Sequence, residues 1–171
     1  MKKTILALCL FAGVSFATQA QKFASVDMSY IMKNIPAYES ANEQLNQVSK
    51  KWQQEVDAAN KEAQEMYKNY QTELVFMTED AKVKREDEIV AKEKAAQELK
   101  RKYFGPEGEL FKKRQSLMKP IQVEIYTAIE DLCNTKDLQF VFDKSSSMNA
   151  IFVSPKLDIS DEVLKKLGYS K

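Results

Sequence analysis

Residues 37–104 read AYESANEQLNQVSKKWQQEVDAANKEAQEMYKNYQTELVFMTEDAKVKREDEIVAKEKAAQELKRKYF, and this stretch decides the fold. It contains neither Gly nor Pro. Ala, Glu, Lys, Gln and Leu dominate it, and these residues are strong helix formers. The stretch therefore predicts long helices with no break imposed by the backbone.

Apolar residues recur along the first half of this stretch in steps of three or four. They are Tyr38, Ala41, Leu45, Val48, Trp52, Val56, Ala59, Ala63, Met66, Tyr70, Leu74 and Met77. Such near-heptad spacing is typical of a helix that packs along one seam against another helix.

A turn is expected where the stripe is interrupted. Leu74-Val75-Phe76-Met77 are four consecutive apolar residues, which cannot all face one seam. Thr78 is a good N-cap, and the acidic Glu79 and Asp80 suit the first turn of a helix. We therefore expect a tight turn near residues 76–78 and a returning helix from Glu79, with one uninterrupted helix as the alternative.

The returning helix should end at Gly105-Pro106-Glu107-Gly108, because proline removes a backbone donor and clashes with the preceding turn. Helix should resume at Glu109 and run to about Thr135. The break is compatible with an elbow that lets the helix swing and equally with a fixed kink.

Shorter elements are predicted at both ends of the chain. In order they are a strand at 22–28, a helix at 29–35, a hairpin of strands at 138–143 and 150–153, and a helix at 160–167 that Gly168 stops. The fold class is therefore α+β, mainly α.

The first twenty residues are predicted to be a secretory signal peptide. Lys2 and Lys3 precede an almost continuously apolar stretch at 5–16, which is shorter than the roughly 20 residues that span a bilayer. Thr18 and Ala20 are the small residues of a cleavage site, so we expect cleavage after Ala20. An uncleaved anchor is the alternative.

Composition argues against nucleic-acid binding and against catalysis. The full chain has 26 basic and 25 acidic residues. Cleavage of the signal would remove Lys2 and Lys3, so the mature chain would have a net charge of −1. Phosphate binding needs a basic excess. The chain has no His and four Gly, so we expect no enzyme, no metal site, no cofactor and no Gly-rich phosphate loop. Cys133, alone in the mature chain, is interpreted as a small buried hydrophobe, with an intermolecular disulfide or a reactive thiol as the alternative.

Helix length then sets the shape of the molecule. A helix of roughly 40 residues is about 60 Å long, whereas a compact domain of this size has a radius of gyration near 15 Å. We expect a helical-hairpin arm at 37–116 that protrudes from a small β-rich body formed by 21–36 and 117–171. Three strands are marginal alone, so the body is expected to oligomerise.

The chain resembles the Skp/OmpH family of periplasmic chaperones in four stretches besides the hairpin. The first is Phe23-Ala-Ser-Val-Asp-Met28, and the second is Pro120-Ile-Gln-Val-Glu-Ile-Tyr-Thr-Ala-Ile129. The third is Leu138-Gln-Phe-Val-Phe-Asp143, and the fourth is Leu157-Asp-Ile-Ser-Asp-Glu-Val-Leu-Lys-Lys-Leu167. The resemblance covers essentially the whole mature chain.

This resemblance implies a jellyfish-like homotrimer with three helical arms around a cavity, located in the periplasm. It also implies an ATP-independent holdase that binds unfolded outer-membrane β-barrel proteins. The family's better-known members are strongly basic, whereas this mature chain is at −1, so no lipopolysaccharide or membrane site is carried over.

Two groups of residues are predicted to do this work. The client-binding candidates are Met66, Tyr67, Tyr70, Leu74, Val75, Phe76 and Met77. Met66, Tyr70 and Leu74 also fit the seam between helices, as does Trp52, whereas the other four lie off the seam or at the turn. The body residues at or near the inter-chain core are Phe23, Val26, Ile31, Ile121, Ile125, Phe140, Phe142 and Ile151.

A second function remains open at this stage. A structural or adaptor coiled coil of the cell envelope would have the same fold and would bind one folded partner. The breadth of client binding distinguishes the two functions.

Overall fold

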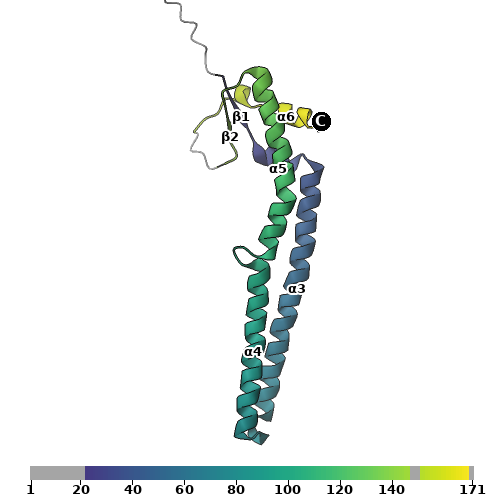
Figure 1. Cartoon of the computed structure of the whole chain (residues 1–171), viewed down its shortest axis with the longest axis vertical. Helices are drawn as coiled ribbons and strands as arrows, with labels where there is room; N and C mark the ends of the chain where they lie inside the picture. The colour runs from purple at the N-terminus through teal and green to yellow at the C-terminus, as the bar shows by residue number, and fades with distance from the viewer. Residues whose placement is uncertain (1–21, 147–150, 170–171) are drawn as a thin grey trace, which may run out of the picture.

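A computed structural model describes residues 22–146 and 151–169 of the chain. It consists of a long helical hairpin with a small body at one end (Figure 1). The mainly helical α+β class is confirmed. The predicted signal peptide lies outside the described residues.

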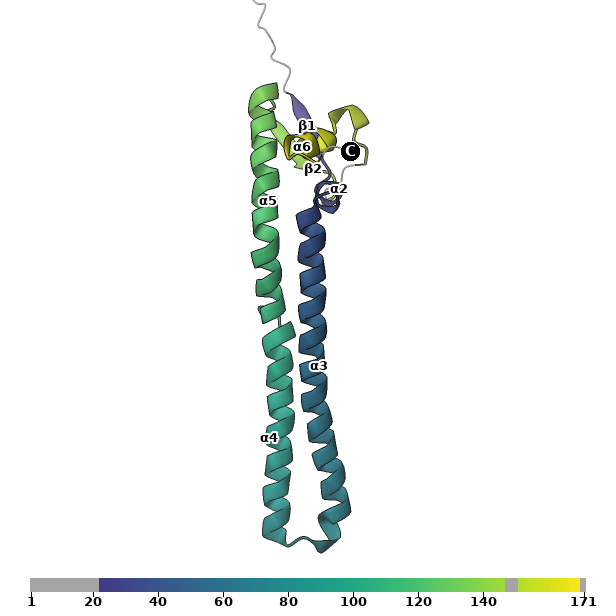
Figure 2. The same ribbon diagram turned by 90° about the vertical axis from the view of Figure 1, so that its right-hand side faces the viewer.

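The arm is built from three helices. Helix α3 (Pro36–Glu73) runs away from the body, a short 3-10 helix η1 (Leu74–Phe76) reverses the chain, and α4 (Glu79–Phe104) and α5 (Glu109–Lys136) return. Figure 2 shows α4 and α5 one after the other alongside α3.

The predicted turn is confirmed, and the single uninterrupted helix is wrong. Thr78 is the N-cap of α4, and its side chain accepts a hydrogen bond from the backbone N–H of Ala81. This cap satisfies a donor that the first turn would otherwise leave open, while Glu79 and Asp80 complement the helix dipole.

The predicted stripe forms the seam of the hairpin. Its buried members on α3 are Ala41, Leu45, Val56, Ala63 and Tyr70, and α4 contributes Ile89 and Ala96. Small residues at several of these positions let the two helix backbones approach closely.

The body joins the two ends of the chain. Strand β1 (Phe23–Val26) pairs in parallel with β2 (Phe140–Asp143), with Phe23 opposite Phe140. Helices α2 (Met28–Lys33) and α6 (Ser160–Lys166) and the short η2 (Pro155–Leu157) complete it. Its core is apolar and includes Ile31, Ile125 and Val163, each fully buried, from α2, α5 and α6.

The predicted strand hairpin is wrong. Residues 151–153 are not in a strand, and Ala150 lies outside the described residues. Strand β2 instead lies against β1, where the N–H of Gln139 donates to the carbonyl of Lys22 and that of Lys144 donates to Val26. Helix α5 ends shortly before β2 and so positions this strand beside β1. The described part of the body therefore has two short strands and less β-structure than expected.

A polar cluster fastens the C-terminal segment to the body. The Lys144 ammonium lies 2.5 Å from a carboxylate oxygen of Asp158 and 4.0 Å from Asp27. The Ser160 hydroxyl donates to Asp158 and accepts from the backbone N–H of Asp27. Burial works to raise the pKa of Asp158, but hydrogen bonds from Lys144 and Ser160 outweigh it and lower that pKa below its usual value.

We expect this cluster to lose its stabilising effect in acid. A carboxyl whose pKa falls on folding stabilises the protein only while it is ionised, so the effect is complete at neutral pH and declines below pH 3.8. The measurement compares the urea midpoints of the wild type and Asp158→Asn from pH 7 to pH 3. The gap between them should narrow at the acid end, and a constant gap would contradict the prediction.

Candidate functional site

The tip of the arm presents apolar side chains to solvent. Val75 and Phe76 in η1 are 84% and 88% exposed, whereas Leu74 and Met77 on either side are half-buried. The N–H of Met77 donates to the carbonyl of Leu74 and closes the turn. A turn this tight leaves the two middle side chains without room against the helices.

The structure divides the seven client-binding candidates. Tyr70 is buried in the seam, and Met66 and Leu74 are half-buried, in agreement with the seam assignment. Tyr67, at 52% exposure, faces solvent. Tyr67, Val75 and Phe76 therefore offer the most accessible apolar surface of this group.

Tyr70 ties the two helices together near the tip. Its hydroxyl donates a hydrogen bond to the carboxylate of Glu86 on α4. This bond, together with burial and the negative charge of Glu86, raises the pKa of Tyr70 from 10.0 to about 12.

We expect the Tyr70 phenol to ionise late in an alkaline titration. The raised pKa means that the neutral phenol stabilises the fold below pH 10 and that this effect is lost as pH rises through about 12. Phenolate absorbance of the wild type minus that of Tyr70→Phe should give a curve centred near 12. Glu86→Ala should move the curve back toward 10. A difference curve centred near 10 in the wild type would refute the assignment.

An aromatic contact holds the middle of the arm. The Trp52 and Tyr103 rings stack with centroids 4.8 Å apart and an interplanar angle of 5°. The Tyr103 hydroxyl donates to Glu55 at 2.5 Å. Trp52 is therefore a seam residue, as predicted.

Two exposed valines on the returning helix were missed as surface residues. Val83 is 58% exposed and Val90 is 45% exposed. Ile89, beside Val90, is buried. Val83 and Val90 are spaced seven residues apart on α4, so they lie on one face of that helix, and this spacing is the signal that could have found them.

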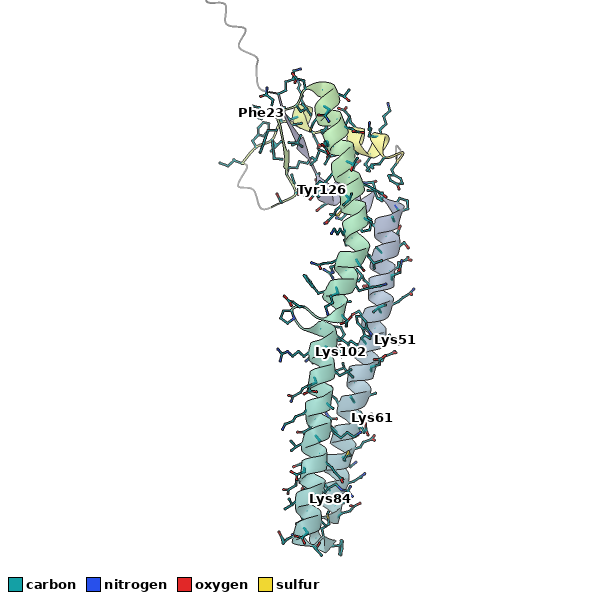
Figure 3. All side chains as sticks on the ribbon, viewed as in Figure 1. Phe23, Lys51, Lys61, Lys84, Lys102 and Tyr126 are labelled. Atoms are coloured by element: carbon teal, nitrogen blue, oxygen red, sulfur yellow. The ribbon has the colours of Figure 1, made fainter. Side chains whose placement is uncertain are left out.

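The predicted body residues also fall into two groups. Val26, Ile31, Ile121 and Ile125 are buried within the chain's own core. Phe23, Phe140 and Ile151 are exposed, and Phe142 is half-buried. Phe23 and Phe140 pack edge to face at 6.3 Å, and Phe140 stacks on Phe142 at the same distance. Figure 3 shows Phe23 on the body, at the opposite end of the molecule from Lys84 of the distal arm.

The described residues contain neither a metal-binding cluster nor a helix able to span a membrane. Within residues 22–146 and 151–169, no group of three or more Cys, Asp or Glu side chains is placed to hold a metal ion. In the same part of the chain, no helix has the length and apolar character needed to cross a bilayer.

These features define a class of protein, namely a small body that carries a long helical arm with apolar side chains at its tip. The model of the family described as outer membrane protein (OmpH-like) matches residues 22–167. The chain belongs to this OmpH-like family, the Skp family of outer membrane protein chaperones, which is non-enzymatic.

A solved structure shares the fold. It is the crystal structure of a proposed outer membrane chaperone (OmpH-like) from Caulobacter crescentus CB15, with a TM-score of 0.68 and 15% sequence identity. The alignment covers 86% of this chain and 83% of that one. Among curated protein sequences, none matches this chain.

Proposed function

We propose that the protein is an ATP-independent holdase that binds unfolded outer-membrane β-barrel proteins along its arm and prevents their aggregation. The observation that carries this proposal is the exposure of Val75 and Phe76 at the tip, far from the body's core. Soluble proteins rarely leave a cluster of large apolar side chains in water unless it meets a partner.

The character of the arm suits an unfolded client. Val83 and Val90 extend the exposed apolar surface along α4 from the tip. Separate small contacts of this kind can bind many different sequences, because each contact is weak and none requires a fixed client shape. Met and aromatic side chains near the tip add adaptable contacts.

We also propose that three copies assemble through the body and that their arms enclose the client. The exposed aromatic pair Phe23 and Phe140 and the exposed Ile151 and Phe152 support a contact between copies. The number three is inferred from the family. Export to the periplasm with cleavage after Ala20 completes the proposal and places the protein on the route of its clients.

The test dilutes a urea-unfolded outer-membrane β-barrel protein into buffer with and without residues 21–171. Light scattering follows aggregation, and the mass of any soluble complex is then measured. We expect suppressed scattering without nucleotide and a complex with three copies of this chain per client. Unchanged scattering at several-fold excess over several unrelated barrels would overturn the proposal and favour an envelope adaptor with one folded partner.

A further inference from the structure

The break between α4 and α5 has the composition of a hinge, since Gly105 and Gly108 flank Pro106 and Glu107. We propose that it is instead a fixed coupling, so that α4 and α5 move as one rod and the arm does not swing at this point. This inference concerns the mechanics of the arm and holds whether or not the arm binds clients.

The first support is how tightly the two glycines pack against backbone atoms. A Cβ added to Gly105 would lie 2.4 Å from the carbonyl oxygen of Arg101. A Cβ added to Gly108 would lie 2.7 Å from that of Tyr103 and 2.9 Å from that of Lys102. Both glycines have negative φ, so the sequence requires glycine here for close approach and not for conformational freedom.

The second support is the hydrogen bonding of the loop. The N–H of Gly105 donates to Arg101 at 2.8 Å and so continues the pattern of α4. The N–H of Gly108 donates to Gly105 at 2.9 Å, and the N–H of Lys112 donates to Gly108 at 3.1 Å. Backbone hydrogen bonds therefore join Gly105 to α4, Gly108 to α5, and the two glycines to each other.

The third support is that the unbroken helix α3 runs alongside the break. This helix is continuous from Pro36 to Glu73 and contacts both α4 and α5. The Trp52 ring of α3 stacks on Tyr103, two residues before Gly105. Glu55 of α3 accepts a hydrogen bond from the Tyr103 hydroxyl. A swing at the break would have to bend α3 or separate this stack.

Double electron–electron resonance, which measures the distance between two spin labels, tests whether α4 and α5 move as one rod. The labels are placed at the exposed Ala91 and Gln122, on either side of the break, in a Cys133→Ser background. A reference pair at the exposed Gln44 and Thr72 spans about 42 Å of the unbroken α3. Labelled chains are diluted with unlabelled chains so that distances within one chain dominate.

We expect one distance peak across the break, no wider than that of the reference pair. Two peaks, or one peak at least twice as wide as the reference, would overturn the inference and establish an elbow. This comparison needs no further variant, so it remains decisive even if glycine substitutions fail to fold.

Two variants then test the stated cause. Gly108→Ala must displace backbone oxygens, so it should broaden or shift the peak while far-ultraviolet circular dichroism shows that the helices remain. Glu107→Ala, in the same loop but exposed, is the matched control and should leave the peak unchanged. A Gly108→Ala peak identical to the wild type would refute the role of glycine packing.

Discussion

Replacement of Ile125 by alanine should lower the free energy of unfolding by about 3–4 kcal/mol, within the usual range of 2–5 kcal/mol for this change in a core. Ile125 is 0% exposed and belongs to the body's core. It lies on α5, whereas Ile31 and Val163 reach the same core from α2 and α6. The lost side chain would leave a cavity at the place where three helices meet, and the surroundings can fill it only in part.

Urea unfolding followed by circular dichroism measures this effect. Both proteins must be compared at one chain concentration, because assembly adds to apparent stability. Gln122→Ala, on the same helix but exposed, should change the free energy by less than about 0.5 kcal/mol. A loss below about 1 kcal/mol for Ile125→Ala would contradict the prediction. It would show that the core closes around the gap or that Ile125 contributes little to the stability of the core.

Removal of the apolar tip should weaken client protection about tenfold. The change is the double variant Val75→Ser and Phe76→Ser, which keeps the turn and takes away its two most exposed apolar side chains. Burial of such a side chain contributes about 1.5–3 kcal/mol when complete. If the client buries both side chains only in part, the double variant should lose about 1.4 kcal/mol of binding free energy, which is a tenfold change in affinity.

The amount of chaperone that halves the light scattering of a diluted β-barrel protein is the quantity to compare. Gln71→Ser is the matched control, because Gln71 is exposed near the tip and is already polar. The thermal unfolding of both variants should match the wild type, since neither Val75 nor Phe76 is part of the core. Full protection by the double variant would place client binding elsewhere on the arm or the body.

The hairpin could be predicted because its signals are local. Absence of Gly and Pro, a repeat of three and four residues, and Thr78 ahead of two acids each act within a few residues of the structure they specify. The exposure of Val75 and Phe76 follows from the same interruption of the stripe. Local energetics therefore fixed both the turn and its most exposed residues.

The sheet could not be predicted in the same way. The alternating residues at 140–143 suit either a hairpin with 150–153 or a parallel partner, and only the tertiary packing of α5 selects the latter. On α4, Ile89 and Val90 are adjacent apolar residues, and the sequence alone does not state which one faces α3. Contacts between distant segments decide both questions.

The parallel pairing of β1 with β2 has a consequence for the order of folding. The backbone N–H of Met28, just after β1, donates to the carboxylate of Asp143, 115 residues further along the chain. The arm uses contacts between nearer segments, and such contacts form faster because less loop entropy is lost. During synthesis, the N-terminal strand therefore cannot pair until the last quarter of the chain has been made, so the arm can form before the body is complete.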